Sequence, residues 1–65
     1  MGKITEREKI ILKFIANGLD NKEIGENISI STHTVKAHIS SIIKKLNAKN
    51  RTNAVFIAMK NKLIK

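Results

Sequence analysis

The fold of this chain is decided by one amphipathic segment, Ile30 to Leu46, with the sequence ISTHTVKAHISSIIKKL. Its large apolar residues recur at the steps of one helix face and span an arc of roughly 100°; they are Val35, Ile39, Ile42, Ile43 and Leu46. The opposite face carries short, polar or basic side chains and no acid: His33, Ala37, Ser40 and Lys44, with Lys36 and Ser41 at its margins. Such a helix is either an ordinary solvated surface helix or one that lies in a groove lined with phosphates.

The size and composition of the chain exclude several classes of protein. A chain of 65 residues forms one domain, near the lower limit for folding without disulfides or metal. It has no cysteine, which removes disulfides and zinc–thiolate sites and fits a reducing cytoplasm. The two histidines are too few for a metal site, and no apolar run approaches the ~20 residues that cross a membrane. We therefore expect a cytoplasmic protein with no metal, no cofactor and no membrane partner.

Charge is unevenly distributed along the sequence, whose formal net charge is +8. Residues 1–26 contain five basic and five acidic residues, which cancel. Residues 27–65 contain eight basic residues and no acid; the basic residues are Lys36, Lys44, Lys45, Lys49, Arg51, Lys60, Lys62 and Lys65. The excess therefore lies in the half that contains the amphipathic segment. It predicts a polyanionic partner, and nucleic acid before membrane.

Capping residues predict four helices. The expected N-caps are Thr5, Asp20, Ser31 and Asn50. Glu8 and Glu23 stand three residues after the first two caps and complete capping boxes. We expect Gly18 to supply the left-handed residue after the first helix and Asn61 the one after the last. The helices are expected over about 6–17, 21–28, 32–46 and 51–61. Because no segment alternates like a strand, the fold class is an all-α four-helix bundle in one domain, residues 1–65.

The apolar positions of the four helices predict a small core. Its expected members are Ile4, Ile11, Leu12, Ile15, Ile24, Ile28, Ile30, Val35, Ile39, Ile42, Ile43, Leu46, Ala54, Val55 and Ala58, with Leu63 and Ile64 folding back onto it. Gly25 lies in the middle of the second helix, where glycine costs about 1 kcal/mol relative to alanine. Either another helix crosses closely at Gly25, or the glycine is a tolerated weak spot.

The order of the second and third helices is that of a helix-turn-helix motif: a short helix, a turn of three or four residues and a longer basic helix. Ile24, Ile28, Ile30 and Val35 are placed to fill the wedge between the two helices. The longer helix then protrudes, and its diameter of ~10–12 Å matches a major groove ~12 Å wide.

Seven short pieces of the sequence together resemble the LuxR/GerE-type DNA-binding domain of bacterial transcription regulators. In order, they are Ile4–Glu8, Ile15–Gly18, Asn21–Ile24, Ile30–Ser31, Thr34–His38, Lys45–Leu46 and Arg51–Val55. The resemblance extends from Ile4 to Ile64. It implies four helices, of which the third reads the major groove and the fourth mediates dimerisation. It also implies that the domain commonly follows a receiver domain of a two-component response regulator or a ligand-binding domain, although it also occurs alone.

The resemblance and the helix geometry together assign candidate DNA contacts. The candidates are Asn21, Lys22, Thr32, His33, Thr34, Lys36, Ala37, Ser40, Ser41, Lys44 and Lys45. Lys36 matches a base-contacting lysine of the family, with a phosphate contact as the alternative, and Ala37 matches a groove-facing position that can touch a thymine methyl. His38 lies nearer the buried face, so we expect a half-buried histidine rather than a DNA contact. Most of the remaining candidates are expected on the sugar–phosphate backbone.

The fourth helix carries a candidate dimer surface made of Thr52, Phe56 and Met59, which lies ~120–160° away from the expected buried alanines. Single exposed apolar residues are also common on monomers, which is the alternative explanation. The prediction is therefore sequence-specific binding of double-stranded DNA by a transcription regulator, with helix 32–46 in the major groove and a homodimer on two half-sites. The dimer is expected to be weak without DNA. The resemblance leaves RNA polymerase open as a further partner.

Two functions other than DNA binding make different demands on the sequence. No carboxylate pair, nucleophile–base arrangement or glycine-rich phosphate loop is present, so the chain is not expected to be an enzyme. A cationic helical module that binds an acidic protein or a membrane surface is the rival from another class. Such a module predicts salt-sensitive binding without base-sequence preference.

Overall fold

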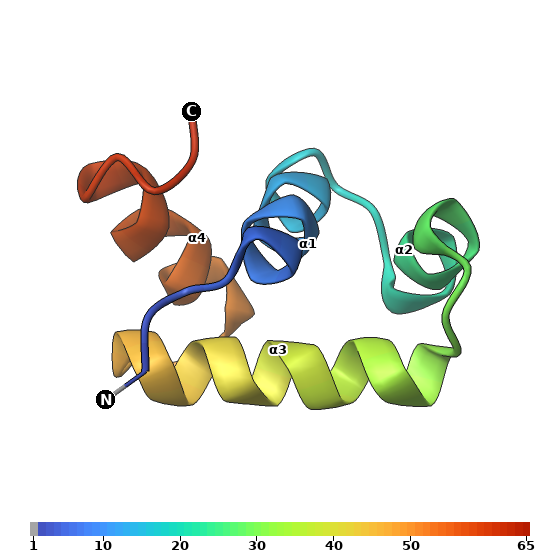
Figure 1. The fold of residues 1–65 in the computed structure, drawn as a ribbon. Coiled ribbons are helices and arrows are strands. Elements are labelled where there is room, and N and C mark those ends of the chain that lie inside the picture. The colour runs from blue at the N-terminus through green and yellow to red at the C-terminus, as the bar shows by residue number, and fades with distance from the viewer. Residues whose placement is uncertain (1) are drawn as a thin grey trace.

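The computed structural model describes residues 2–65, so Met1 of the expected domain lies outside the described residues. Within this range the chain forms four α-helices and no strand: α1 Glu6–Ala16, α2 Asn21–Ile28, α3 Thr32–Leu46 and α4 Arg51–Lys60. The predicted all-α fold is confirmed. Figure 1 shows α1, α2 and α4 on the same side of α3, which runs along the whole molecule. None of these helices is long and apolar enough to cross a membrane.

Each helix begins at a side-chain cap that the sequence predicted. The caps are Thr5, Asp20, Ser31 and Asn50, and each accepts a hydrogen bond from the backbone N–H three residues later. Glu8 and Glu23 reciprocate by accepting from the backbone N–H of their caps at 2.8 and 2.9 Å. A local side chain therefore satisfies one of the free N–H donors at the start of every helix, and the start of each helix is determined by residues within three positions.

The left-handed residue expected at the end of α1 is found at the predicted position, whereas the one expected at the end of α4 is not. Gly18 adopts a left-handed backbone with φ 86°. After α4 the left-handed residue is Lys62 with φ 60°, and Asn61 keeps φ −91°. The side chain of Asn61 instead donates to the carbonyl of Ile57 at 2.9 Å, so the chain reverses one residue later than expected. This turn carries the C-terminal residues back, and Ile64 is buried against the core.

The core is formed by residues of all four helices and the C-terminal segment. Its buried members are Ile11, Leu12, Ile24, Val35, Ile39, Ile42, Ala54, Ala58 and Ile64. The other predicted core residues are half-buried and pack against these; they are Ile4, Ile15, Ile28, Ile30, Ile43, Leu46 and Val55. α3 contacts each of the other three helices. Its apolar face is therefore the surface on which the domain is assembled.

Gly25 is required by a turn and not by a crossing helix. A Cβ atom at this buried position would lie 2.6 Å from the backbone carbonyl oxygen of Ile30. The N–H of Ile30 also donates to the carbonyl of Gly25 at 3.0 Å. The expectation of a second helix crossing here was wrong, because it is the turn between α2 and α3 that folds back onto the glycine.

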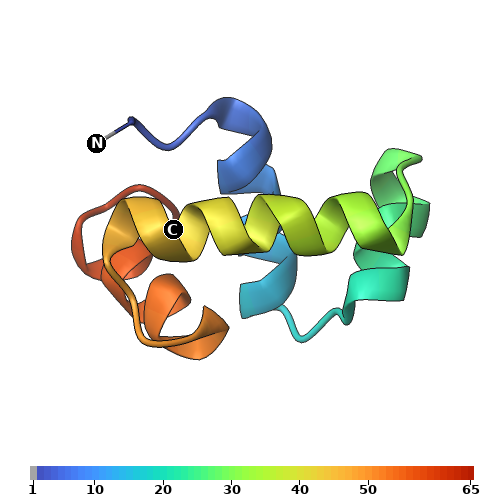
Figure 2. The ribbon, with the colours of Figure 1, turned by 90° about the horizontal axis from the view of Figure 1, so that it is seen from below.

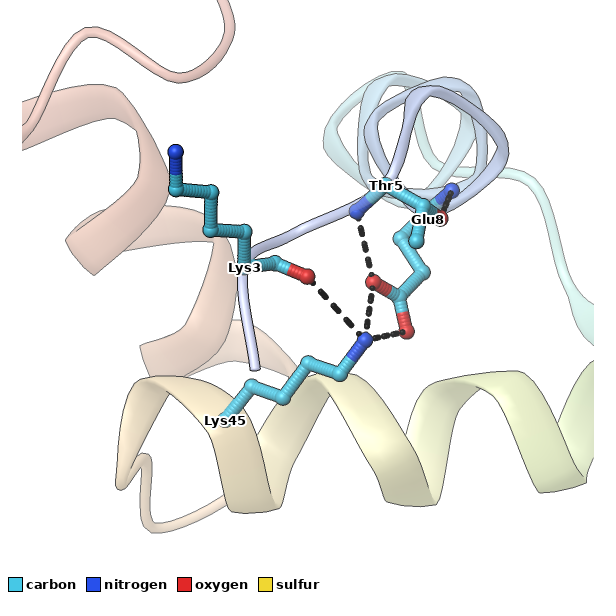
Figure 3. Close-up of polar contacts among 4 residues, drawn as sticks. All are labelled: Lys3, Thr5, Glu8 and Lys45. Carbon is cyan, nitrogen blue, oxygen red and sulfur yellow. Dashed lines mark hydrogen bonds and ion pairs between the residues drawn. The ribbon is translucent and has the colours of Figure 1, made fainter. Parts of the chain in front are cut away.

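A buried ion pair connects α1 to the C-terminal end of α3 (Figure 3). The Lys45 Nζ lies 2.9 and 3.1 Å from the two carboxylate oxygens of Glu8 and also donates to the carbonyl of Lys3 at 3.1 Å. The side chain of Glu8 is only 5% exposed, and that of Lys45 is 23% exposed. Glu8 is thus both the capping-box acid of α1 and the anchor of α3. The ion pair restrains the angle at which α3 lies across the other helices.

These contacts determine the protonation of Glu8. Burial of the carboxyl by itself raises its pKa. The N–H of Thr5 and the ammonium of Lys45 donate hydrogen bonds that lower it, the charge of Lys45 lowers it further, and the hydroxyl of Ser41 adds to this lowering. The pKa of Glu8 therefore lies below its ordinary value of 4.5.

Substitution of Glu8 by glutamine tests this anchor. A carboxyl whose pKa is lowered by folding stabilises the fold above its unfolded pKa, and that stability is lost as the pH falls through the folded pKa. We expect Glu8→Gln to lower the free energy of unfolding at neutral pH by about 1.5–3 kcal/mol, as for hydrogen bonds to charged groups. The difference from the unsubstituted chain should shrink below pH 4.5, as measured by urea unfolding at several pH values.

The matched control is Glu6→Gln, in the same turn of α1. The Glu6 side chain is 89% exposed and pairs with Lys9 at 3.2 Å on the surface, where screening makes such a pair weak. Equal losses of stability in the two variants, or a difference between them that does not change with pH, would contradict the assignment of Glu8 as the anchor.

Candidate nucleic-acid interface

The side of α3 that faces away from the other helices is uncovered over its full length (Figure 2). α3 has 15 residues, which at 1.5 Å per residue makes it about 22 Å long. One continuous row of exposed side chains follows this side, here termed the outer stripe: His33, Lys36, Ala37, Ser40 and Lys44. Thr32, at the start of the helix, is exposed as well. The structure therefore brings six of the predicted contact residues onto one free surface.

Three other predicted contact residues lie off the outer stripe and have partners within the chain. The hydroxyl of Thr34 lies 2.9 Å from that of Ser31 at the cap of α3. Ser41 is half-buried and lowers the pKa of Glu8. Lys45 is held by Glu8 and by the carbonyl of Lys3. These residues face the start of the helix or α1, and the periodicity of α3 alone did not distinguish them from the stripe.

The two predicted contacts at the start of α2 differ in exposure. Lys22 is exposed, whereas Asn21 is half-buried. Asn21 lines a hollow together with Lys36 and Ser40 of the outer stripe. The fold therefore places the first residue of α2 beside the middle of α3, although 15 residues separate Asn21 from Lys36 in sequence.

This hollow, here termed the basic hollow, has a volume of about 540 Å³ and opens beside the outer stripe. Its lining residues are Asn21, Lys36, Ile39, Ser40, Ile43, Lys49, Asn50 and Arg51. They include three cations and no acid. Lys49, Asn50 and Arg51 are not among the contacts predicted from the sequence. The only sequence signal for them was the absence of acids after residue 26.

The described ion pairs explain why this side of the molecule is strongly basic. The carboxylates of Glu6 and Glu8 pair with Lys9 and Lys45. No ion pair within residues 2–65 involves a lysine of the outer stripe or a cation of the basic hollow. Their charges are therefore free to interact with a polyanion. In the same range, no group of three or more His, Cys, Asp or Glu side chains is arranged to hold a metal ion.

α4 presents apolar side chains on its outside. Ala54 and Ala58 are buried, whereas Phe56 is 62% exposed and Met59 is 50% exposed. Thr52 is exposed too. Thr52, Phe56 and Met59 are the residues of the dimer surface predicted from the sequence. A third large apolar side chain, Ile10 of α1, is 42% exposed.

Comparison with known proteins shows similar chains among bacterial regulators. Residues 3–58 match the family described as "Bacterial regulatory proteins, luxR family". The chain is 48% identical over 61 residues to the transcriptional regulatory protein LiaR of Bacillus subtilis, and 46% identical over 61 residues to the response regulator protein VraR of Staphylococcus aureus. Each match covers 94% of this chain but 29% of the relative. The chain thus spans about three-tenths of the length of these relatives.

Two solved structures have the same fold. The response regulator ChrA of a heme-sensing two-component system superposes with a TM-score of 0.93 at 36% identity, over 98% of this chain and 32% of ChrA. The transcription factor GerE superposes with a TM-score of 0.93 at 28% identity, over 100% of this chain and 97% of GerE. The family match covers most of the sequence, and the fold agrees over its whole length. The chain therefore belongs to the luxR family of bacterial regulatory proteins.

Proposed function

We propose that this chain is a DNA-binding domain that recognises double-stranded DNA by sequence, with α3 in the major groove. The observation that carries the proposal is the outer stripe: an uncovered helix face, about 22 Å long, with lysines that have no acidic partner in the described part of the chain. A helix of this diameter fits a groove ~12 Å wide. Membership of the luxR family supports the same conclusion, since its relatives LiaR and VraR are named as regulators.

Within this proposal the middle of the outer stripe reads bases, and its two ends and the start of α2 hold the DNA backbone. Lys36 and Ala37 lie near the middle of the stripe and are assigned to base edges. Thr32 and His33 at the start of α3, and Lys22 at the start of α2, are placed to reach phosphates. Lys45 reaches a phosphate only if its ammonium leaves Glu8, so backbone contact at the end of α3 falls chiefly to Lys44.

The proposal includes a homodimer on two half-sites, formed through Thr52, Phe56 and Met59. A two-fold contact of α4 against its own copy buries the exposed apolar groups and holds two α3 helices at a fixed spacing. Because the surface is small, the dimer is weak without DNA.

A protein that binds chromosomal DNA in a bacterium works in the cytoplasm, where RNA polymerase is a further candidate partner.

Selection of duplexes from a random pool, followed by gel-shift titration, tests the proposed function. The selected duplex should bind more tightly than its scrambled counterpart at each of two salt concentrations, because base readout adds to the salt-dependent phosphate contacts. Equal affinity for both duplexes would contradict sequence recognition. It would favour instead a cationic module for acidic proteins or anionic surfaces.

Lys36→Ala tests base readout. The variant should lose about 1–3 kcal/mol of affinity for the selected duplex and relax the preference at one base pair in each half-site. A repeated selection with the variant measures this preference. The matched comparison is Lys44→Ala, which removes the same charge from the same helix and should weaken selected and scrambled duplexes alike. If Lys36→Ala also weakens both equally, Lys36 is a phosphate contact.

The salt dependence of binding tests the C-terminal end of α3. Each neutralised phosphate adds about 0.9 to the slope of log affinity against log salt. Lys44→Ala should lower the slope by this amount. Lys45→Ala distinguishes a phosphate contact from the ion pair with Glu8. A lower slope means that the Lys45 ammonium of the unsubstituted chain leaves Glu8 to bind DNA. An unchanged slope with lower thermal stability means that Lys45 serves the ion pair alone. An unchanged slope in both variants would remove this end of α3 from the interface.

Phe56→Lys tests the dimer surface. Phe56 is 62% exposed, so the variant should fold normally and bind a single half-site unchanged. It should lose cooperative binding to a duplex with two half-sites, because a charge at the centre of the two-fold contact faces its own copy. The matched control is Ile10→Lys, which adds the same charge to an exposed apolar site on α1 and should remain cooperative. Retained cooperativity in Phe56→Lys would exclude α4 as the dimer surface.

A further inference from the structure

Three cationic side chains from separate segments converge on the basic hollow. Lys36 comes from the second turn of α3, Lys49 from the linker after α3, and Arg51 from the first turn of α4. The hollow has no acid in its lining, and no ion pair within residues 2–65 involves any of the three. Like charges repel, so this arrangement favours an anion that is shared among them.

The position of the hollow relates it directly to the outer stripe. Lys36 and Ser40 belong to both, so a group held in the hollow lies alongside α3. Figure 2 shows the first turns of α2 and α4 on one side of α3, and the segment before α1 on the other. The Glu8–Lys45 pair therefore lies on the opposite side of α3 from the hollow, and Glu8, the one buried acid among residues 2–65, does not compete for its cations.

Polar groups of the lining are also left without partners. The Oδ1 atom of Asn21 is buried and has no hydrogen-bond partner among the described residues. In α4, the cap Asn50 accepts from the N–H of Asn53 at 2.8 Å, which leaves the N–H groups of the first two helical residues without an intrahelical acceptor. The hollow thus offers donors as well as charge.

We propose that the basic hollow holds one phosphate of the DNA backbone at the edge of the major groove, bound by Lys49 and Arg51. This inference rests on the proposed function and adds the linker after α3 and the start of α4 to the interface. A phosphate at this place neutralises the two cations, and Lys36 is then free to extend along the outer stripe to a base edge. The hollow is a positioning site: it sets how far α3 slides along the groove without reading sequence.

The double variant Lys49→Gln/Arg51→Gln tests the proposal by gel-shift titration on a duplex with a single half-site. The slope of log affinity against log salt should fall by about 0.9, as expected for one lost phosphate contact. The ratio of affinities for selected and scrambled duplexes should stay the same, because a phosphate contact carries no sequence information. Lys60→Gln/Lys65→Gln removes the same charge from exposed positions at the other end of α4 and should leave the slope unchanged.

A neutral methylphosphonate, moved one position at a time along the selected duplex, locates the phosphate. Among the positions that weaken binding of the unsubstituted chain, one at the edge of the half-site should have no effect on the double variant, whereas the positions of the other phosphate contacts should weaken both proteins. If circular dichroism shows that the double variant is unfolded, the single variant Lys49→Gln is used in its place. Its side chain is exposed in the linker, and the same change with smaller amplitude is expected.

The outcomes separate this proposal from the proposed function. If the unsubstituted chain binds no duplex in a salt-dependent manner, both fail. If it binds and discriminates, but the slope and the methylphosphonate pattern of the double variant are unchanged, the hollow is empty on DNA and only this proposal fails. An equal fall in slope for the Lys60/Lys65 control, or altered sequence discrimination in the double variant, would also overturn it.

Discussion

The apolar face of α3 is the surface that the other three helices must cover. A chain of 65 residues has little apolar surface to bury, and its largest fully buried side chains come from α1, α2 and α3, with two buried alanines of α4 in the same core. Since all three helices pack on the same side, the opposite side of α3 stays free along its length (Figure 1). The same packing that stabilises the domain therefore exposes the outer stripe. Folding and the proposed function depend on one amphipathic helix.

The acidic and basic residues are also separated between the two halves of the chain. All five acids lie in the first 26 residues. One of them, Glu8, is buried and fastens the end of α3 to α1, while Glu6 and Glu23 serve a surface pair and a capping box. None of these acids lines the basic hollow. The cations of α3 and of the start of α4 are thus left for a partner, and the orientation of α3 is maintained by a contact on the side away from that hollow.

Features of the fold that depend on neighbouring residues were predictable. Each of the four N-caps is a Ser, Thr, Asp or Asn whose side chain accepts a hydrogen bond from the backbone N–H three residues later, so residues close in sequence are enough to predict it. The buried face of α3 follows from the helical spacing of its apolar residues. Features that depend on the path of the backbone were not. Gly25 gave no indication that the carbonyl of Ile30 would approach it, and nothing local showed that Lys62, and not Asn61, would take the left-handed conformation.

The candidate interface shows the same division between local and long-range information. Helical periodicity alone placed His33, Lys36, Ala37, Ser40 and Lys44 on one face, because side chains three and four residues apart must lie on the same side of a helix. It could not place Lys45, whose ammonium meets a carboxylate 37 residues earlier in the chain. Nor could it bring Asn21, Lys49 and Arg51 together around Lys36. Those neighbours belong to different helices and a linker, and only the packing of α2 and α4 against α3 decides which of their side chains share one hollow.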